Sequence, residues 1–301
     1  MSIVAEWIAL DWGTSRLRAW AMAGETVLAA ASSDQGMGRL ARDGFEPALL
    51  ALVGDWLAPD RRTLALACGM VGARQGWAEA GYRSVPCPPV AADGFQRAPV
   101  TDARLEVRIL PGLSQATPAD VMRGEEVQIA GFLKAEPEFD GVLCLPGTHS
   151  KWVRISAGEA VSFQTFMTGE LFALLAESSV LRHSVAAEGW DEPAFLAAVD
   201  DALSRPERLA ARLFTLRAEG LLTGLAPELA RARLSGLLIG AELAAARPYW
   251  LGQAVAVIGA AGISNAYSAA LRRQGAAPRL AEGDAMVLAG LIAAHRIGRE
   301  G

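Results

Sequence analysis

The sequence predicts an α/β protein built from two similar lobes. Two observations support this prediction: apolar strand-like runs alternate with helix-like segments along all 301 residues, and one strand–turn–strand pattern opens each half of the chain. A chain of this length also fits two domains better than one. We place the domain boundary so that 1–136 forms an N-terminal domain and 137–301 a C-terminal domain.

The two strand–turn–strand patterns resemble each other in detail. In EWIALDWGTSRLRAWAM, apolar residues lead to Asp11 and the chain then turns at Gly13 and Thr14. In CLPGTHSKWV, apolar residues again lead to a turn, here at Gly147 and Thr148. The two turn glycines are 147 − 13 = 134 residues apart, close to half the chain. This repeat indicates a duplicated α/β domain.

The remaining elements follow from apolar periodicity and from helix start signals. Strands are expected at 63–67, 107–110 and 254–259, and helices at 48–57, 119–134, 263–273, 285–297 and several places within 191–246. Thr168 is expected to cap a helix with an apolar stripe, and Pro193, Pro206 and Pro227 to occupy first helical turns. The last helix is expected to pack back on the first domain, and the helix at 237–246 fits either a core or a dimer face.

Composition narrows the functional classes. A 52% apolar share with 20% charged residues describes a globular protein with much to bury, and the net charge of −5 argues against a nucleic-acid partner. Three scattered cysteines suggest reduced, buried thiols in a cytoplasmic protein. The uncharged stretch 248–271 is better split into strand, glycine turn and helix than interpreted as a membrane span, so no membrane partner is expected.

A Gly-Thr turn between two strands is suited to binding phosphate. Its backbone N–H groups form an anion nest and the threonine hydroxyl adds a donor. Arg16 and Lys151 would add positive charge, one to each loop. Asp11, at the end of the first strand, is placed to hold Mg²⁺, chiefly through water. Two such loops facing each other would hold a polyphosphate from both sides.

Seven stretches in order carry a resemblance to a known family: DWGTSRLRAW, CGMVGARQGW, MRGEEVQIAG, LPGTHSKWV, FQTFMTGELF, VIGAAGISNAYSAAL and EGDAMVLAGL. The chain resembles the sugar kinases of the actin, heat-shock-protein and hexokinase superfamily, and within it the 2-dehydro-3-deoxygalactonokinases. The resemblance implies two RNase H-like (actin-like ATPase) domains that close around ATP and Mg²⁺. It also implies phosphoryl transfer to the 6-hydroxyl of 2-dehydro-3-deoxy-D-galactonate, in galactonate catabolism.

The resemblance assigns ATP-binding roles to three loops. The phosphate 1 loop would contain Gly13, Thr14, Ser15 and Arg16; the phosphate 2 loop Gly147, Thr148, His149, Ser150 and Lys151; and the adenosine motif Gly259, Gly262 and Ser264. Phosphoryl transfer further needs a carboxylate to accept or orient the hydroxyl proton. Glu125 best fits that role by its spacing to Gly131, although related kinases mostly use Asp there. Glu126 and Asp120 remain alternatives.

The sugar acid needs a cation for its carboxylate. Arg74, in CGMVGARQGW, is the first candidate and Arg123 the second, with Met70 as a residue that would shape the pocket. The three histidines are not spaced as metal ligands.

Other functions remain open at this stage. VAVIGAAGIS is typical of a dinucleotide-binding turn but lacks the full G-x-G-x-x-G pattern. P-loop and protein-kinase motifs do not occur in the sequence. A kinase for 2-dehydro-3-deoxy-gluconate, or a non-catalytic nucleotide-binding sensor of the same fold, would share these motifs. A homodimer is compatible with the sequence.

Overall fold

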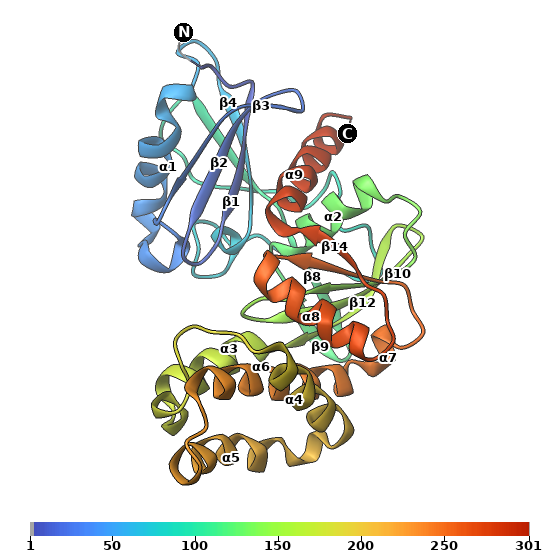
Figure 1. Cartoon of the computed structure of the whole chain (residues 1–301). Helices are drawn as coiled ribbons and strands as arrows, with labels where there is room; N and C mark the ends of the chain where they lie inside the picture. The colour runs from blue at the N-terminus through green and yellow to red at the C-terminus, as the bar shows by residue number, and fades with distance from the viewer. Residues whose placement is uncertain (1–2, 301) are drawn as a thin grey trace. The chain divides into compact units, whose positions relative to one another are not determined.

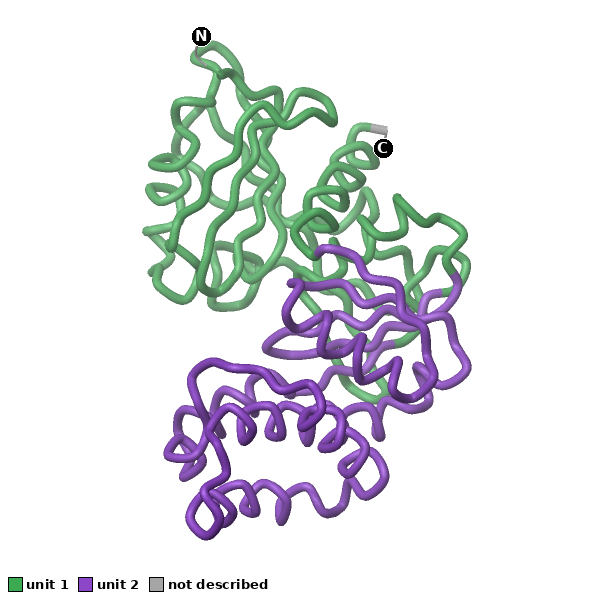
Figure 2. The backbone as a smooth tube through the Cα atoms, viewed as in Figure 1, with its two compact units in different colours: residues 1–139, 156–162, 283–301 green, residues 140–155, 163–282 purple. Residues whose placement is uncertain are grey.

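The first predicted hairpin forms strands β1 (Trp7–Trp12) and β2 (Leu17–Ala23), whose antiparallel register sets Asp11 opposite Arg18. The structure is a computed structural model that describes residues 3–300. The chain divides into two units: the first contains residues up to 139, 156–162 and those from 283 onward, and the second contains 140–155 and 163–282 (Figure 2).

The main sheet of the first unit has the order β3-β2-β1-β4-β7-β6. Its further strands are β3 (Thr26–Ser33), β4 (Thr63–Cys68), β6 (Gln96–Arg97) and β7 (Leu105–Ile109). Strands β1, β2 and β3 form an antiparallel meander, while β4 and β7 continue the sheet in parallel with β1. A smaller sheet has the order β5-β8-β9, with β5 (Tyr82–Ser84), β8 (Gly112–Ala116) and β9 (Ala119–Met122).

The five-stranded sheet repeats this arrangement in the order β12-β11-β10-β13-β14. Its strands are β10 (Gly141–Leu145), β11 (Ser150–Ser156), β12 (Glu159–Phe166), β13 (Val255–Gly259) and β14 (Arg279–Glu282). The hairpin β10–β11 is antiparallel, and β13 and β14 continue parallel to β10, as β4 and β7 do beside β1. The predicted duplication is therefore confirmed, and the two sheets have the strand arrangement expected of RNase H-like domains.

The helices of the first unit are α1 (Phe45–Val53), α2 (Glu125–Ala135) and α9 (Gly283–Glu300). Helices α2 and α9 lie side by side (Figure 1) and approach closely at two glycines. A Cβ on Gly131 would lie 2.0 Å from the carbonyl oxygen of Met286, and one on Gly290 would lie 1.9 Å from that of Val127. Only glycine permits this crossing, which fixes where the first turn of each helix lies.

The helices of the second unit are α3 (Thr168–Ala173), α4 (Glu192–Ser204), α5 (Leu209–Leu222), α6 (Pro227–Ala245), α7 (Arg247–Trp250) and α8 (Ala261–Arg273). Helix α6 is a core helix, because Leu237, Leu238, Ile239 and Leu243 are buried. It packs against α4, and Gly236 allows the close approach. As predicted, Pro193, Pro206 and Pro227 lie in first helical turns.

Two predictions of local structure were wrong. The helix expected at 119–134 begins only at Glu125, because the residues of β9 pair with β8 and Gly124, at φ 104°, separates strand from helix. Thr168 does not cap α3: Met167 holds the N-cap position, and the Thr168 hydroxyl donates instead to the buried carboxylate of Glu242. A hydroxyl forms a stronger hydrogen bond by donating to a nearby carboxylate than by accepting a backbone N–H at a helix end.

Other expectations hold. The predicted strands at 63–67, 107–110 and 254–259 correspond to β4, β7 and β13, and the helix expected at 48–57 overlaps α1, which begins at Phe45. The cysteines Cys68, Cys87 and Cys144 are buried and unpaired. Within residues 3–300, none of the helices combines the length and apolarity that crossing a bilayer requires.

Candidate active site

Asp11 lies at the carboxyl end of β1, with 19% of its side chain exposed. Arg18 reaches its Oδ2 atom from β2, with Nε at 3.0 Å, and also pairs with Asp284 in the first turn of α9. Burial raises the pKa of Asp11 above its ordinary value, and the Arg18 charge partly offsets that rise. One arginine thus holds two carboxylates at this corner of the first unit.

The first hairpin loop is held from its inner side. The carbonyl oxygens of Gly13 and Thr14 accept hydrogen bonds from the N–H groups of Met37 and Gly38, both at 2.9 Å. A Cβ on Gly36 would lie 2.3 Å from the carbonyl carbon of Ser15, so the supporting turn needs glycine there. The side chains of Thr14, Ser15 and Arg16 are exposed. The loop therefore presents its hydroxyls and its arginine outward on a fixed backbone.

The first turn of α2 lies at the same corner as Asp11, and Gly69 shows why. A Cβ on Gly69 would meet the Oδ1 atom of Asp11 at 3.4 Å, and a Cβ on Gly124 would meet the Cα atom of Gly69 at 3.4 Å. Gly69 itself adopts φ 92°, which favours glycine. The structure therefore brings Asp11 and the start of α2, where Glu125 stands, close to the same glycine.

Glu125 and Glu126 differ in their surroundings. Glu125 is partly exposed, and one of its carboxylate oxygens accepts a hydrogen bond from the backbone N–H of Arg123 at 3.1 Å. Glu126 is fully buried and accepts the N–H of Gly124 at 2.7 Å, while its Oε1 atom has no partner among the described residues. Burial, with a contribution from the neighbouring Glu125, raises the pKa of Glu126 to about 8. Glu126 is therefore largely protonated at neutral pH.

Asp120, the third candidate carboxylate, lies elsewhere. It stands on β9 beside the turn of the β8–β9 hairpin, opposite Gln115, and it accepts the backbone N–H of Val121 at 2.8 Å. The structure does not place it in the first turn of α2 with the other two.

The three candidate substrate residues have different positions. Met70 follows Gly69 directly, in a 3₁₀ turn. Arg74 has an exposed side chain. The guanidinium of Arg123 lies over the Tyr82 ring, 4.4 Å from its centroid. Its Nη2 group donates to the carbonyl oxygen of Ala80 at 2.6 Å, whereas its buried Nε and Nη1 have no partner among the described residues.

The second hairpin loop is braced by α3. The N–H of Glu170 donates to the carbonyl oxygen of Thr148 at 2.9 Å, and its carboxylate lies 2.6 Å from Nε2 of His149. A Cβ on Gly169 would lie 2.2 Å from the carbonyl oxygen of Gly147, so helix and loop touch backbone to backbone. Gly147, Thr148 and His149 are exposed, as are the tip residues of the first loop.

Ser150 and Lys151, at the end of the second loop, are buried. The Ser150 hydroxyl lies 2.8 Å from the hydroxyl of Tyr267 on α8, inside the protein. The structure thus turns these two predicted ATP-binding side chains inward and leaves the backbone and the first three loop residues outside.

The predicted adenosine motif lies directly beside the second loop. A Cβ on Gly259 would meet the carbonyl oxygen of Pro146 at 3.4 Å and the hydroxyl oxygen of Ser264 at 3.0 Å. Ser264 is buried, whereas Gly262 lines a cavity. The residues predicted from the two motifs of the second unit therefore meet at one place.

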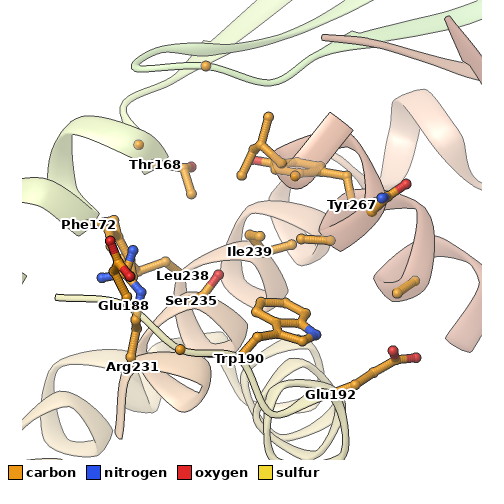
Figure 3. Close-up of a pocket in the computed structure, with 18 of the residues that line it drawn as sticks. Thr168, Phe172, Glu188, Trp190, Glu192, Arg231, Ser235, Leu238, Ile239 and Tyr267 are labelled. Atoms are coloured by element: carbon orange, nitrogen blue, oxygen red, sulfur yellow. The ribbon is translucent and has the colours of Figure 1, made fainter. Parts of the chain in front are cut away.

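This cavity has a volume of about 770 Å³ and lies entirely within the second unit. It is bounded by Gly147 of the second loop, by α8, by α6 and by the segment before α4. Figure 3 shows Trp190, Ile239 and Tyr267 directed toward this space, with Glu188 and Arg231 at one side. Its size and mostly apolar lining are typical of a small-molecule site.

Sequence reasoning missed most of the residues that line the cavity. Trp190 is 51% exposed although it is a large aromatic side chain, and it contacts Phe195, with ring centroids 4.6 Å apart. Arg231 lies over Phe172 and donates to the carbonyl oxygen of Ala186 at 3.2 Å. These residues come from separate helices and from the loop before α4, and they carry no local motif, so only the fold could collect them.

The residues near Asp11 fit Mg²⁺ held largely by water. Nowhere in residues 3–300 do three or more His, Cys, Asp or Glu side chains gather as a metal-binding group. A single buried carboxylate whose pKa is raised by burial benefits from a cation, and Mg²⁺ keeps several waters when few carboxylates are offered.

Comparison with known proteins decides the family. Residues 11–294 match the profile of the 2-keto-3-deoxy-galactonokinases. The chain belongs to this family. Among curated 2-dehydro-3-deoxygalactonokinases, it is 41% identical to a protein of Rhizobium meliloti (strain 1021) named as a probable enzyme of this kind, over 98% of both chains. It is 35% identical to the enzyme of Escherichia coli (strain K12), over 96% of this chain and 97% of that one.

A crystal structure supports the same family. The chain has a TM-score of 0.87 and 40% identity to a Sinorhizobium meliloti protein provisionally assigned as a 2-dehydro-3-deoxygalactonokinase, with 96% of each chain covered. The family resemblance inferred from seven short stretches is thus confirmed over nearly the whole length of the chain.

Proposed function

We propose that this protein transfers the γ-phosphoryl group of ATP to the 6-hydroxyl of 2-dehydro-3-deoxy-D-galactonate. The observation that supports this most is the corner of the first unit where Gly69 brings Asp11 and the first turn of α2 together. An ionisable carboxylate beside a metal-binding carboxylate is what phosphoryl transfer to an alcohol needs. Family membership supplies the substrate class.

In this proposal Glu125 takes the proton of the 6-hydroxyl. The hydroxyl oxygen then forms a bond to the γ-phosphorus, the bond from that phosphorus to the β–γ bridging oxygen breaks, and ADP leaves. Glu126 is unsuited to this role because it is fully buried and its pKa is about 8. Glu125 is the partly exposed carboxylate of the pair, which supports its choice.

Asp11 would hold Mg²⁺ through water. When bound, that ion would neutralise charge on the phosphates. The residues of the first loop would add donors, with Arg16 supplying a positive charge from the exposed tip. Because Arg18 engages the Oδ2 atom of Asp11, it orients the carboxylate and leaves Oδ1 facing Gly69.

The second loop and the cavity would bind the rest of the nucleotide. The backbone at Gly147 and Thr148 would serve as an anion nest, with His149 beside it. The cavity joins this loop to Gly262, and Trp190 offers an aromatic face for the adenine. Ser150 and Lys151 would support the loop from inside, since both are buried.

For the substrate carboxylate we propose Arg123 ahead of Arg74. Arg123 has two buried nitrogen atoms without partners among the described residues, and such donors are costly unless a ligand satisfies them. A Cβ on Gly72, in the turn that begins at Met70, would lie 2.9 Å from Nη1 of Arg123, so this guanidinium lies beside that turn.

The buried, unpaired cysteines further support a reducing compartment such as the cytoplasm.

The test is an ADP-release assay with ATP and Mg²⁺ on a panel of 2-keto-3-deoxy acids, their parent aldonates and free hexoses. We expect turnover on the galactonate-type acid. Glu125→Gln should lower kcat by about 100- to 10,000-fold with ATP binding retained, whereas Asp120→Asn should change it little. Turnover on the gluconate-type acid alone would show that this acid, and not the galactonate-type acid, is the substrate. ATP binding without ADP release on any acid would favour a sensor instead.

A further inference from the structure

Glu242, on α6, is an acidic residue buried in the core of the second unit, with 3% of its surface exposed. Its Oε1 atom accepts a hydrogen bond from the indole Nε1–H of Trp152 at 2.7 Å. Its Oε2 atom accepts one from the hydroxyl of Tyr267, also at 2.7 Å, and another from the hydroxyl of Thr168. Three side chains from three different elements therefore donate to one carboxylate.

The direction of each hydrogen bond follows from counting protons. A tyrosine hydroxyl has one proton, and that of Tyr267 is given to Glu242. The neighbouring Ser150 hydroxyl, 2.8 Å from the Tyr267 oxygen, must then be the donor of that contact. The chain of donors runs from Ser150 through Tyr267 to Glu242. The hydroxyl proton of Ser150 is consequently unable to serve a ligand.

These donors come from the elements that form the candidate nucleotide site. Ser150 and Trp152 stand on β11 directly after the second loop. Thr168 begins α3, whose next residue, Gly169, touches the loop backbone. Tyr267 belongs to α8, which follows the adenosine turn. Thr168 and Tyr267 also line the cavity, so Glu242 holds two of its walls from behind.

Burying a carboxylate in this core has a free-energy cost. Burial raises the pKa of Glu242, and the hydrogen bonds from Thr168, Tyr267 and Trp152 oppose that rise. An apolar side chain of similar volume at a buried site of this kind is often as stable or more stable. Directional bonds to three elements provide what an apolar side chain lacks, namely one fixed arrangement of those elements.

We infer that Glu242 is a positioning residue for nucleotide binding, which locks the second loop, α3 and α8 into the geometry that holds ATP. This inference rests on the proposed function, in which the second unit binds ATP. Glu242 touches no ligand itself and acts through Thr168, Tyr267 and β11. Its removal should therefore weaken ATP binding more than it slows the chemical step.

The test compares three variants of the full chain. Glu242→Gln keeps the size but replaces one carboxylate oxygen by an NH2 donor, and Tyr267→Phe removes one donor while keeping the ring. Glu219→Gln is the matched control, because Glu219, on α5, pairs with Arg233, which stands on α6 as Glu242 does, and neither Glu219 nor Arg233 lines the cavity. Calorimetry with ATP, the Tm and the separate values of KM and kcat are measured for each.

We expect Glu242→Gln to raise the Kd and the KM for ATP about tenfold, which is about 1.4 kcal/mol, with kcat within about threefold of wild type. Tyr267→Phe should show a smaller rise, and Glu219→Gln should lower the Tm without changing the Kd. If Glu242→Gln and Glu219→Gln lower the Tm alike and leave the Kd unchanged, the role is only structural and the inference fails. If Glu242→Gln does not fold, an unchanged Kd in Tyr267→Phe overturns it. Absence of ATP binding in the wild type would overturn the proposed nucleotide site itself.

Discussion

Arg18 and Asp11 face each other across β1 and β2, and the arginine also reaches Asp284 at the start of α9. One guanidinium therefore links the end of β1 to the first turn of α9. The pairing matters because Asp11 is largely buried, and its pKa is raised by that burial despite the arginine. A partly buried carboxylate of this kind depends on its cation partner.

Replacing Arg18 should therefore destabilise the first unit. We expect Arg18→Gln to lower the free energy of unfolding by about 2 kcal/mol, below the full cost of breaking a completely buried pair because both side chains are about one-fifth exposed. Denaturant unfolding measures this. Arg97→Gln is the control, since Arg97 is 73% exposed in its ion pair with Glu106, and its loss should cost less than about 0.5 kcal/mol. Equal losses in both variants would contradict the structure.

Glu126 should make the fold less stable as pH rises. Its pKa is about 8 in the folded protein and 4.5 in a model peptide, so between these values the unfolded chain releases a proton that the folded chain keeps. Stability then falls with rising pH across that window, by on the order of 5 kcal/mol over the whole shift. Glu126→Gln removes this contribution.

The measurement is the free energy of unfolding from pH 5 to pH 8 for wild type and variant. We expect Glu126→Gln to become progressively more stable than wild type as the pH rises. Glu138→Gln, at an exposed position, should follow the wild-type curve. A constant difference between wild type and Glu126→Gln over the whole window would show that Glu126 titrates normally.

Gly131 should be intolerant of any side chain. A Cβ there would lie 2.0 Å from the carbonyl oxygen of Met286 in α9, and backbone cannot move aside as a flexible side chain can. We expect Gly131→Ala to cost about 3 kcal/mol and to reduce kcat, because the α2–α9 crossing positions Glu125. Gly54→Ala is the control, since a Cβ there has nothing within 4 Å. A Tm drop shared by both variants would argue against the helix crossing as its cause.

Trp190 should contribute to nucleotide affinity. Its half-exposed ring is directed into the cavity (Figure 3), where stacking on a base adds binding free energy. We expect Trp190→Ala to raise the Kd for ATP about tenfold, and Trp190→Phe to raise it less. Leu222→Ala, at a residue 84% exposed on α5, should leave the Kd unchanged. Calorimetry that shows no change for Trp190→Ala would place the base elsewhere.

Local sequence determined much of the fold because strand and turn signals are local. The hairpins that end in Gly13-Thr14 and Gly147-Thr148 were predictable from apolar runs and turn residues, and both occur. The failure at 119–124 has a physical cause: β9 exists only because it pairs with β8, and a pairing partner is not visible in a four-residue segment.

The sequence alone also indicated the family and the positions of the two Gly-Thr loops, since both depend on short motifs. Tertiary structure decided the surroundings of each carboxylate. Glu125 and Glu126 are adjacent in sequence, yet the helix leaves one partly exposed and buries the other, and burial raises the pKa of Glu126. Likewise, Trp190 and Glu242 carry no motif. Their roles come from burial and from partners distant in the chain, and only the folded packing creates these.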